Sequence, residues 1–503
     1  MGIKSFAARQ LAGVLAPQIY KEQSNAIDIQ QRLLENLLAV GAKTKFGRTH
    51  HLHKNMEPSQ FQQQVPICDY EGFTEYIDQI ADGEPDVLWR GKPLYFCKSS
   101  GTTSGTKYIP VSAAQISDMV RAARNSLMLY VAETGKAQFF DRKMIFLQGS
   151  PVLEKHGEIA AGRLSGIVYH HVPFYARASR MPSYEINCIE DWEEKVTAIA
   201  KETLHQPMSL ISGIPPWVVM YFEKLRELSS KDLIKDIFPN FELFAFGGVN
   251  YEPYRHKIES MVGFKIPSVE TYPASEGFIA YQDSQQHEGM LLNVNGGIFF
   301  EFVELSKIHN TNPERLTLKD VEIGVNYALI LTTNAGLWAY SIGDTVKFVS
   351  KNPYRIVVTG RIKHFISAFG EHVISEEVEF SLRHAMLDMH CSVTEFTVAP
   401  QVTPPDGTAP YHEWFVEFSK LPHSINQFAG MLDEYMKAKN SYYRDLREGH
   451  VLQQLKVRAV PAGTFASYMK SIGKLGGQNK VPRLKNDREI ANALMQLLNA
   501  DKG

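Results

Sequence analysis

Apolar residues recur at helical spacing near the start of the chain. Between residues 24 and 41 they lie three or four positions apart, with Ser24 placed to begin a helix and Gly41 to end it. The residues of this stripe are Ile29, Leu33, Leu37 and Val40. A similar but more interrupted stripe covers the first 20 residues, and it is too short for a signal peptide. Both predict amphipathic helices packed on the body of the protein.

Between about residues 240 and 360 the pattern changes to short apolar runs separated by turn signals. The runs are "FELFAFGG", "FKIPSVETY", "GMLLNVNGGIFFEFVEL", "NYALILTTNAGLWAYSIGD" and "YRIVVTG". Asn295-Gly296 and "TNAG" at 333–336 predict hairpin turns, so part of this region should be antiparallel. A helical pattern at residues 252–263 interleaves with these runs, which favours an α/β fold.

After about residue 360 the pattern becomes that of a smaller α+β unit. Strands are predicted at "TEFTVAP", "EWFVEF" and "QQLKVRAV", around a helix that begins at Ser424. Ser424 with Gln427 fits a capping box. Since 503 residues exceed the usual size of one domain, we expect two domains, one over residues 1–358 and one over residues 359–503.

Charge and cysteine content narrow the class of protein. The 53 basic and 55 acidic residues give a net charge of −2, which argues against a nucleic-acid-binding protein. Cys68, Cys97, Cys188 and Cys391 lie far apart with no CxxC pair, which argues against a zinc site or disulfides and favours the cytoplasm. No apolar run reaches 18 residues, so we expect no membrane partner.

The stretch "KSSGTTSGTKYIP" at residues 98–110 is rich in glycine and hydroxyl residues between two extended segments. Ser112 with Gln115, just after it, fits a capping box and predicts the start of a helix. The stretch is not a Walker A loop, because only three residues separate Gly101 from Gly105 and Tyr108 follows the lysine. A GxGxxG fingerprint is also absent from the stretch. Its N–H and O–H donors could wrap phosphates, or the stretch could be a plain polar loop.

Three later segments carry residue types suited to a nucleotide. In "ETYPASEG", Tyr272 could stack on a purine and Glu276 could hold Mg²⁺. In "YSIGDTVKF", Asp344 could accept both ribose hydroxyls, and Arg361 opens a basic segment at the presumed domain boundary. Each residue has a structural alternative: a core aromatic, a solvated turn acid, a turn former and a surface charge, respectively.

The order of these segments resembles that in the adenylate-forming enzymes, and among them the Gretchen Hagen family of acyl acid amido synthetases, which includes bacterial members. The match runs through "AKTKFGRTHHL", "SSGTTSG", "GGVNYEPY", "TYPASEG", "LTTNAGLWAYSIGD", "NSYYRDLREG" and "GQNKVPRLKN", nearly the whole chain. The resemblance implies that residues 1–358 form a large adenylate-forming domain with mixed sheets and a β-barrel-like part. It also implies that this domain binds ATP and the acid, and that residues 359–503 form a smaller mobile α+β domain.

The resemblance also implies an activity: MgATP activates a small carboxylic acid as an acyl adenylate, which an amine, usually that of an amino acid, then attacks. It assigns the ATP phosphates to Ser99, Ser100, Gly101, Thr102, Thr103 and Ser104. Further nucleotide contacts fall on Tyr272, Ser275, Asp344 and Arg361. Glu276 would bind Mg²⁺, and Lys480 would reach the α-phosphate and the acyl carboxylate during adenylation.

The acyl pocket and the product stay open at this stage. Tyr169, Phe174 and Trp217 could line a slot for the acid, although such residues usually belong to the core. Ser341 stands where plant members carry arginine, and His372 near the position of a lysine, and these departures concern the second half-reaction. An acid:CoA ligase that shares the adenylation step, and a catalytically silent acyl- or nucleotide-binding protein, remain the alternatives.

Overall fold

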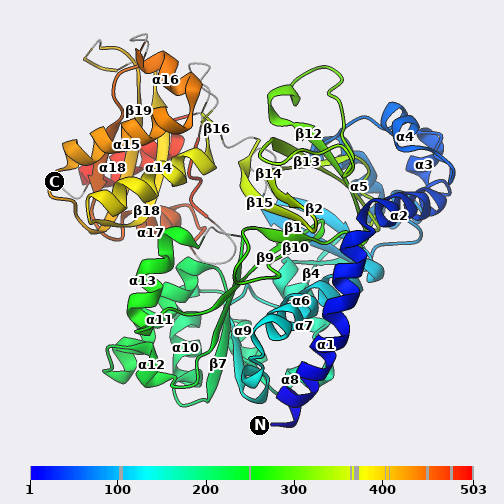
Figure 1. Ribbon diagram of the computed structural model, residues 1–503, viewed down its shortest axis with the longest axis horizontal. Helices are drawn as coiled ribbons and strands as arrows, with labels where there is room; N and C mark the ends of the chain where they lie inside the picture. The colour runs from blue at the N-terminus through cyan, green and yellow to red at the C-terminus, as the bar shows by residue number, and fades with distance from the viewer. Residues whose placement is uncertain are drawn as a thin grey trace. The chain divides into compact units, whose positions relative to one another are not determined.

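In the computed structural model (Figure 1), the chain folds into two compact units, which are described separately. The first comprises Met1–Asn250 and Lys257–Val358, and the second comprises Tyr251–His256 and Thr359–Gly503. The structure describes residues 2–100, 106–248, 251–362, 365–366, 373–402, 404–406, 408–448, 452–475, 480–485 and 487–500.

The α-helices of the first unit, apart from the one shared with the second unit, precede residue 240. They are α1 (Ile3–Ser24), α2 (Ala26–Gly41), α3 (Lys45–Thr49), α4 (Pro58–Gln64), α5 (Thr74–Ala81), α6 (Ala113–Thr134), α7 (Leu164–His170), α8 (Phe174–Arg177), α9 (Tyr184–Asn187), α10 (Trp192–Thr203), α11 (Pro215–Ser229) and α12 (Ile234–Ile237), with α13 (Glu252–Val262) shared with the second unit. Short 3-10 helices are η1 (Tyr70–Phe73), η2 (Gln138–Asp141) and η3 (Leu305–Lys307).

The strands of the first unit are β1 (Tyr95–Ser100), β2 (Thr106–Val111), β3 (Lys143–Phe146), β4 (Glu154–His156), β5 (Ile159–Gly162), β6 (Arg180–Met181), β7 (Met208–Ser212), β8 (Leu243–Gly247), β9 (Ser268–Ala274), β10 (Gly277–Tyr281), β11 (Met290–Leu292), β12 (Ile298–Glu304), β13 (Asn326–Thr333), β14 (Tyr340–Lys351) and β15 (Tyr354–Arg361), of which the last ends in the second unit. From residue 243 onward these strands, apart from β10, fall in the predicted apolar runs, whereas β3 to β7 lie in segments where no strand was predicted.

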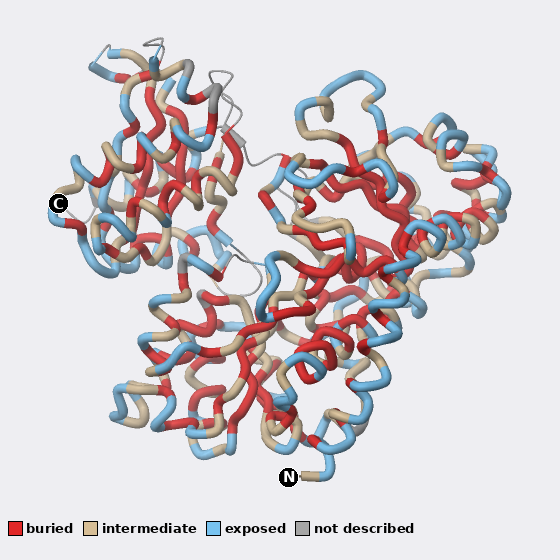
Figure 2. The backbone as a smooth tube through the Cα atoms, in the orientation of Figure 1, coloured by how far each residue is buried: buried red, intermediate tan, exposed pale blue. Residues whose placement is uncertain are grey.

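One large mixed sheet forms the core of the first unit, in the order β12-β13-β14-β15-β11-β10-β9-β8-β7-β3-β6. The five strands from β6 to β9 in this order are parallel to their neighbours, and antiparallel pairing begins at β9 and β10. The strands of this sheet are largely buried, whereas the outer helix faces are exposed (Figure 2). This arrangement confirms the mixed α/β fold class.

A second, smaller sheet has the order β2-β1-β5-β4. Strands β1 and β2 pair antiparallel from Tyr95↔Val111 to Ser100↔Thr106, so the glycine-rich stretch does join two extended segments. Helix α6 follows β2, and the Ser112 hydroxyl caps it by accepting a hydrogen bond from the Gln115 N–H at 3.1 Å.

Two sequence predictions were wrong in detail. Ser24 ends α1 instead of capping the next helix, which begins after Asn25, and the buried side of α2 is centred on Leu34 and Leu38. The Asn295-Gly296 turn does not join a hairpin, because β11 pairs with β10 and β15 while β12 pairs with β13. Tertiary contacts therefore override the local turn signal, whereas residues 334–339 do connect the antiparallel pair β13 and β14.

The second unit is α+β, as predicted. Its elements are β16 (Phe365–Ile366), β17 (Val373–Ile374), α14 (Ser375–Asp388), β18 (Ser392–Gln401), β19 (Tyr411–Lys420), α15 (Ile425–Lys439), α16 (Ser441–Glu448), β20 (Lys456–Val460), α17 (Thr464–Ser471) and α18 (Glu489–Ala500). The β18-β19-β20 sheet packs on α14 and α15 through a core that contains Trp414, Phe428 and Leu432. The predicted helix from Ser424 is interrupted at Asn440, where α15 ends.

Candidate active site

The carboxyl ends of the parallel strands meet at one edge of the large sheet. Because β3, β7, β8 and β9 are parallel, the segments that follow them begin along this edge. In open α/β sheets, ligands bind outside the carboxyl ends of the strands. The turn after β9 contains Ser275 and Glu276, two of the residues singled out from the sequence.

Ser275 is held from two directions. The Cys97 thiol donates to the Ser275 hydroxyl at 3.1 Å, and the Gln115 side-chain amide donates to the Ser275 carbonyl at 3.1 Å. Cys97 lies in β1, two residues before Ser99, so this contact joins the glycine-rich hairpin to the turn after β9. Burial, with the Glu276 charge as a smaller cause, raises the pKa of the Cys97 thiol to about 12, so this cysteine is not a nucleophile at neutral pH.

Glu276 is buried, with 7% of its surface exposed, so the alternative of a solvated turn acid is wrong. The two-residue turn is closed by the Ala274↔Gly277 pair, and Gly277 has φ 150°, a backbone conformation that favours glycine. Within the described part of the chain no group of three or more His, Cys, Asp or Glu could hold a metal. One carboxylate beside a phosphate site nevertheless fits Mg²⁺, which usually takes one or two carboxylates and completes its shell with substrate phosphates and water.

Tyr272 and Asp344 come together although 72 residues separate them. The Tyr272 hydroxyl, from β9, donates to an Asp344 carboxylate oxygen of β14 at 2.5 Å. Tyr272 is 8% exposed. Asp344 lies inside β14, where the pairing with β13 shifts register, so it is not a simple turn former. The structure thus brings together two of the residues predicted to contact a nucleotide.

The glycine-rich hairpin is described only up to its ends. Ser99 pairs with Lys107 in the β1–β2 ladder, and Ser100 pairs with Thr106. Gly101, Thr102, Thr103 and Ser104 lie outside the described residues, so their assignment to phosphates stays a prediction.

Arg361 and Lys480 belong to the second unit. Arg361 is the exposed last residue of β15, and Lys480 is exposed beside the buried Val481. Their approach to Glu276 and Asp344 stays a prediction, as does the mobility of this unit.

The three residues suggested for the acyl pocket are in different surroundings. Trp217, on α11, is 5% exposed and packs on Trp192 with ring centroids 4.3 Å apart. Tyr169, on α7, is half-buried under the Arg180 guanidinium, whose central carbon is 3.7 Å from the ring centroid. The side chain of Phe174 lies outside the described residues. Trp217 therefore has the contacts of a core residue, and the pocket assignment stays a prediction.

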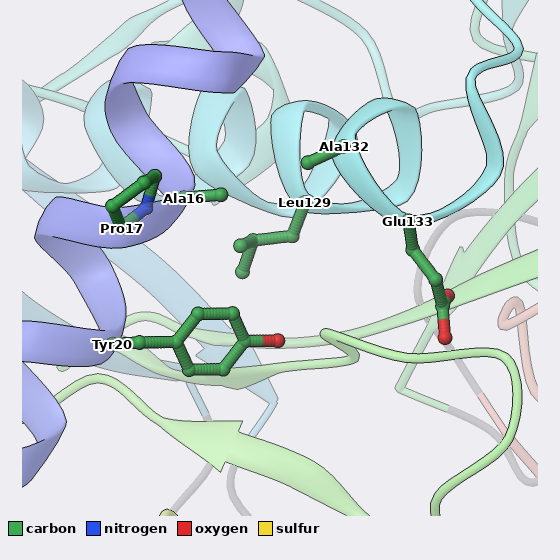
Figure 3. Close-up of a pocket in the computed structure, with 6 residues that line it drawn as sticks. All are labelled: Ala16, Pro17, Tyr20, Leu129, Ala132 and Glu133. Atoms are coloured by element: carbon green, nitrogen blue, oxygen red, sulfur yellow. The ribbon is translucent and has the colours of Figure 1, made fainter.

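A cavity of about 380 Å³ lies between α1 and α6 (Figure 3). It is lined by Ala16, Pro17, Tyr20, Leu129, Ala132 and Glu133. The Glu133 carboxylate accepts hydrogen bonds from the Ser284 hydroxyl at 2.6 Å and the Gln285 N–H at 2.7 Å. None of the residues predicted from the sequence lines this cavity.

Cys97 and Gln115 are the site residues that sequence reasoning missed. Gln115 carried a signal, since its position three residues after Ser112 predicted that its side chain would return to the N-cap. Its amide nitrogen instead donates to Ser275, and its buried carbonyl oxygen has no hydrogen-bond partner. Cys97 carried no signal beyond its place two residues before the hydroxyl-rich stretch.

Family models and solved structures were compared with the chain. The GH3 family N-terminal domain matches residues 16–183 and 154–266, the GH3 family central domain matches residues 291–361, and the GH3 family C-terminal domain matches residues 376–489. The solved GH3.15 acyl acid amido synthetase aligns with a TM-score of 0.79 at 17% identity, over 94% of this chain and 93% of that chain. A 2-hydroxyisobutyryl-CoA ligase aligns with a TM-score of 0.61 at 13% identity, over 94% and 91%. Both share the fold.

Characterised plant proteins are similar along their whole length. Jasmonoyl–L-amino acid synthetase JAR4 of Nicotiana attenuata is 22% identical, over 94% of this chain and 93% of its own. Indole-3-acetic acid-amido synthetase GH3.3 of Arabidopsis thaliana is also 22% identical, over 93% and 91%. In the part of the chain that the structure describes, no helix is long and apolar enough to cross a membrane. With its N-terminal, central and C-terminal regions all matched, the chain belongs to the GH3 (Gretchen Hagen) family, as the order of its motifs predicted.

Proposed function

We propose that this protein is an ATP-dependent acyl acid amido synthetase, which adenylates a small carboxylic acid and transfers the acyl group to an amine such as that of an amino acid. The observation that carries the proposal is the fixed turn after β9. There the buried Glu276 lies beside Ser275, which the glycine-rich hairpin holds through Cys97. Membership of the GH3 family and the Tyr272–Asp344 contact support the same assignment.

In this reaction the acid carboxylate attacks the α-phosphorus of ATP, and pyrophosphate leaves. The glycine-rich loop would hold the phosphates through N–H and O–H donors, and Asp344 and Tyr272 would hold the nucleoside. Glu276 would hold Mg²⁺, which when bound neutralises charge on the phosphates. The Cys97 and Gln115 contacts keep Ser275 fixed beside that carboxylate, so little reorganisation is needed when the phosphates bind.

In the second half-reaction a neutral amine attacks the acyl carbon, AMP leaves with the electron pair of the broken anhydride bond, and the new amide nitrogen releases one proton to water. No side-chain nucleophile is needed, which agrees with the raised pKa of Cys97. Lys480 would stabilise the charge that builds at the α-phosphorus in the first half-reaction, and Arg361 would contact the nucleotide.

The proposal is tested by product analysis. The purified protein is incubated with MgATP, a panel of acids and either a panel of amino acids or CoA, and products are identified by mass. Amides with release of AMP and pyrophosphate are expected. Thioesters without amides would assign the protein as an acid:CoA ligase, and the absence of both, with ATP bound, would make it a nucleotide-binding protein.

A further inference from the structure

Three hydrogen-bond donors near the carboxyl end of β3 have no partner among the residues that the structure describes. The Gln148 side-chain nitrogen and the Ser165 hydroxyl are buried atoms without a hydrogen bond. The half-buried Arg163 guanidinium makes no hydrogen bond or ion pair with any residue the structure describes, and burial alone lowers its pKa. Buried donors without partners are uncommon in folded proteins, and a bound water, ion or ligand can supply the missing acceptor.

These donors gather around Gly149, in the segment after β3. A Cβ placed on Gly149 would lie 3.1 Å from the Arg163 Cδ and 3.5 Å from the Ser165 Oγ. Gln148 is the preceding residue. Between Arg163 and Ser165, the Leu164 N–H donates to the Cys97 thiol, which itself donates to Ser275. The group therefore lies on the carboxyl edge of the sheet, close to the Ser275–Glu276 turn.

A second cation adds to the positive potential here. Lys195 is 2% exposed and donates to the Asn187 carbonyl at 2.6 Å, and the nearby Arg163 charge contributes to the lowering of its pKa. The Asn187 side chain is fully buried, and neither its nitrogen nor its oxygen has a partner. Two cations without a carboxylate partner among the described residues are costly to bury, and an anionic ligand would offset that cost.

We propose that Arg163, together with Gln148 and Ser165, binds a substrate carboxylate that does not itself react. This inference rests on the proposed function. A guanidinium presents a planar fork of N–H donors that matches a carboxylate, and an amide and a hydroxyl supply further donors. The reacting carboxylate loses its charge when it is adenylated, so a fixed cation at that group would favour the substrate over the transition state.

Two substrates could carry such a carboxylate. One is an amino acid, whose α-carboxylate keeps its charge while its amine attacks. The other is a dicarboxylic acid, whose second carboxylate keeps its charge during adenylation. Loss of an amino acid's contact would slow amide formation, whereas loss of a dicarboxylic acid's contact would slow adenylation. The same Arg163 variant therefore tests both substrates.

The test compares the wild-type protein with Arg163→Gln and Arg163→Lys. Acid-dependent pyrophosphate exchange is measured without amine, using glutarate against valerate. Amide formation is then measured with each of the 20 common L-amino acids against its α-carboxamide. We expect Arg163→Gln to lower kcat/KM about 100-fold for the member of one pair that carries the additional carboxylate, glutarate or the amino acid, and to leave valerate or the α-carboxamide unchanged. Arg163→Lys should recover part of the loss, and Arg32→Gln, at an exposed arginine of α2, should change neither.

Equal losses for both members of each pair would overturn the proposal and make Arg163 a structural or phosphate-binding residue. No loss in either pair would overturn it as well. A direct measurement separates it from the proposed function: titration calorimetry of the wild type and Arg163→Gln with the same amino acids, α-carboxamides and dicarboxylates. If the wild type binds no amino acid more tightly than its α-carboxamide, and glutarate no more tightly than valerate, the site is wrong, whereas absence of pyrophosphate exchange with every acid refutes the adenylation step.

Discussion

Lys195 shows how one buried charge changes the stability of the fold. Its ammonium is 2% exposed and has one hydrogen-bond acceptor, the Asn187 carbonyl. Burial lowers the pKa of Lys195 from 10.5 to about 8. Cys188 has the opposite effect on this pKa, and the Arg163 charge lowers it further. The folded protein therefore releases this proton at a lower pH than the unfolded chain does.

This shift predicts a pH dependence of stability. Below pH 8 both the folded and unfolded chains carry the charge, and burial costs roughly 3 kcal/mol at about 1.4 kcal/mol per pKa unit. Between pH 8 and 10.5 only the unfolded chain keeps the proton, so the free energy of unfolding rises with pH. Urea unfolding at several pH values should show this rise in the wild type and a flatter curve in Lys195→Met.

The exposed Lys201, on the same helix, provides the matched control. Lys201→Met should keep the pH dependence of the wild type. A curve for Lys195→Met that follows the wild type would contradict the assigned shift.

At the scale of elements, the turn after β9 owes its position to contacts that are distant in sequence. The apolar runs predicted β9, the hydroxyl-rich stretch was placed between two extended segments that became β1 and β2, and Ser112 with Gln115 predicted the start of α6. They could not predict that Gln115 reaches Ser275, because that contact spans 160 residues and depends on how α6 packs against the sheet. The same reason explains the misplaced Asn295-Gly296 hairpin, since strand partners are chosen by the whole sheet.

Gln115→Leu tests the role of this contact. Leucine keeps most of the side-chain volume but removes the amide that donates to the Ser275 carbonyl. We expect kcat/KM for adenylation to fall about tenfold, with more Mg²⁺ needed for half-maximal rate, because the turn that carries Glu276 is held less firmly. Pyrophosphate exchange at varied Mg²⁺ measures both effects.

Gln427→Leu is a suitable control, because Gln427 is an exposed residue at the same helical position of α15. It should leave exchange unchanged. An unaltered Mg²⁺ requirement in Gln115→Leu would remove Gln115 from the account of the site.

At the scale of the whole molecule, the sequence identified the family better than it identified the site. Motif order predicted the GH3 family because it extends over nearly the whole chain. The contact between Tyr272 and Asp344, by contrast, could not be predicted from the sequence, because it depends on the strand order and register of a mixed sheet. No recognisable motif contains Arg163, Gln148 or Ser165. Only the folded chain shows that their donors lack hydrogen-bond acceptors among the described residues.

Lys480 tests whether the second unit takes part in chemistry. If its ammonium reaches the α-phosphate only during adenylation, Lys480→Ala should lower the rate of pyrophosphate exchange roughly 100-fold or more while ATP affinity changes little. Amine transfer from a supplied acyl adenylate should survive. Lys437→Ala, at a surface ion pair of α15, should affect neither step. Equal loss of both half-reactions would show that Lys480 is structural or serves both.

The most direct test of the central claim is acid-dependent exchange of labelled pyrophosphate into ATP in the absence of amine. Adenylation precedes transfer in our account, so at least one acid from a broad panel should support exchange that requires Mg²⁺. Glu276→Gln should abolish most of it, because the buried carboxylate beside Ser275 would lose its charge. Exchange in Glu276→Gln at the wild-type rate, or no exchange with any acid in a protein that is folded, would contradict the account.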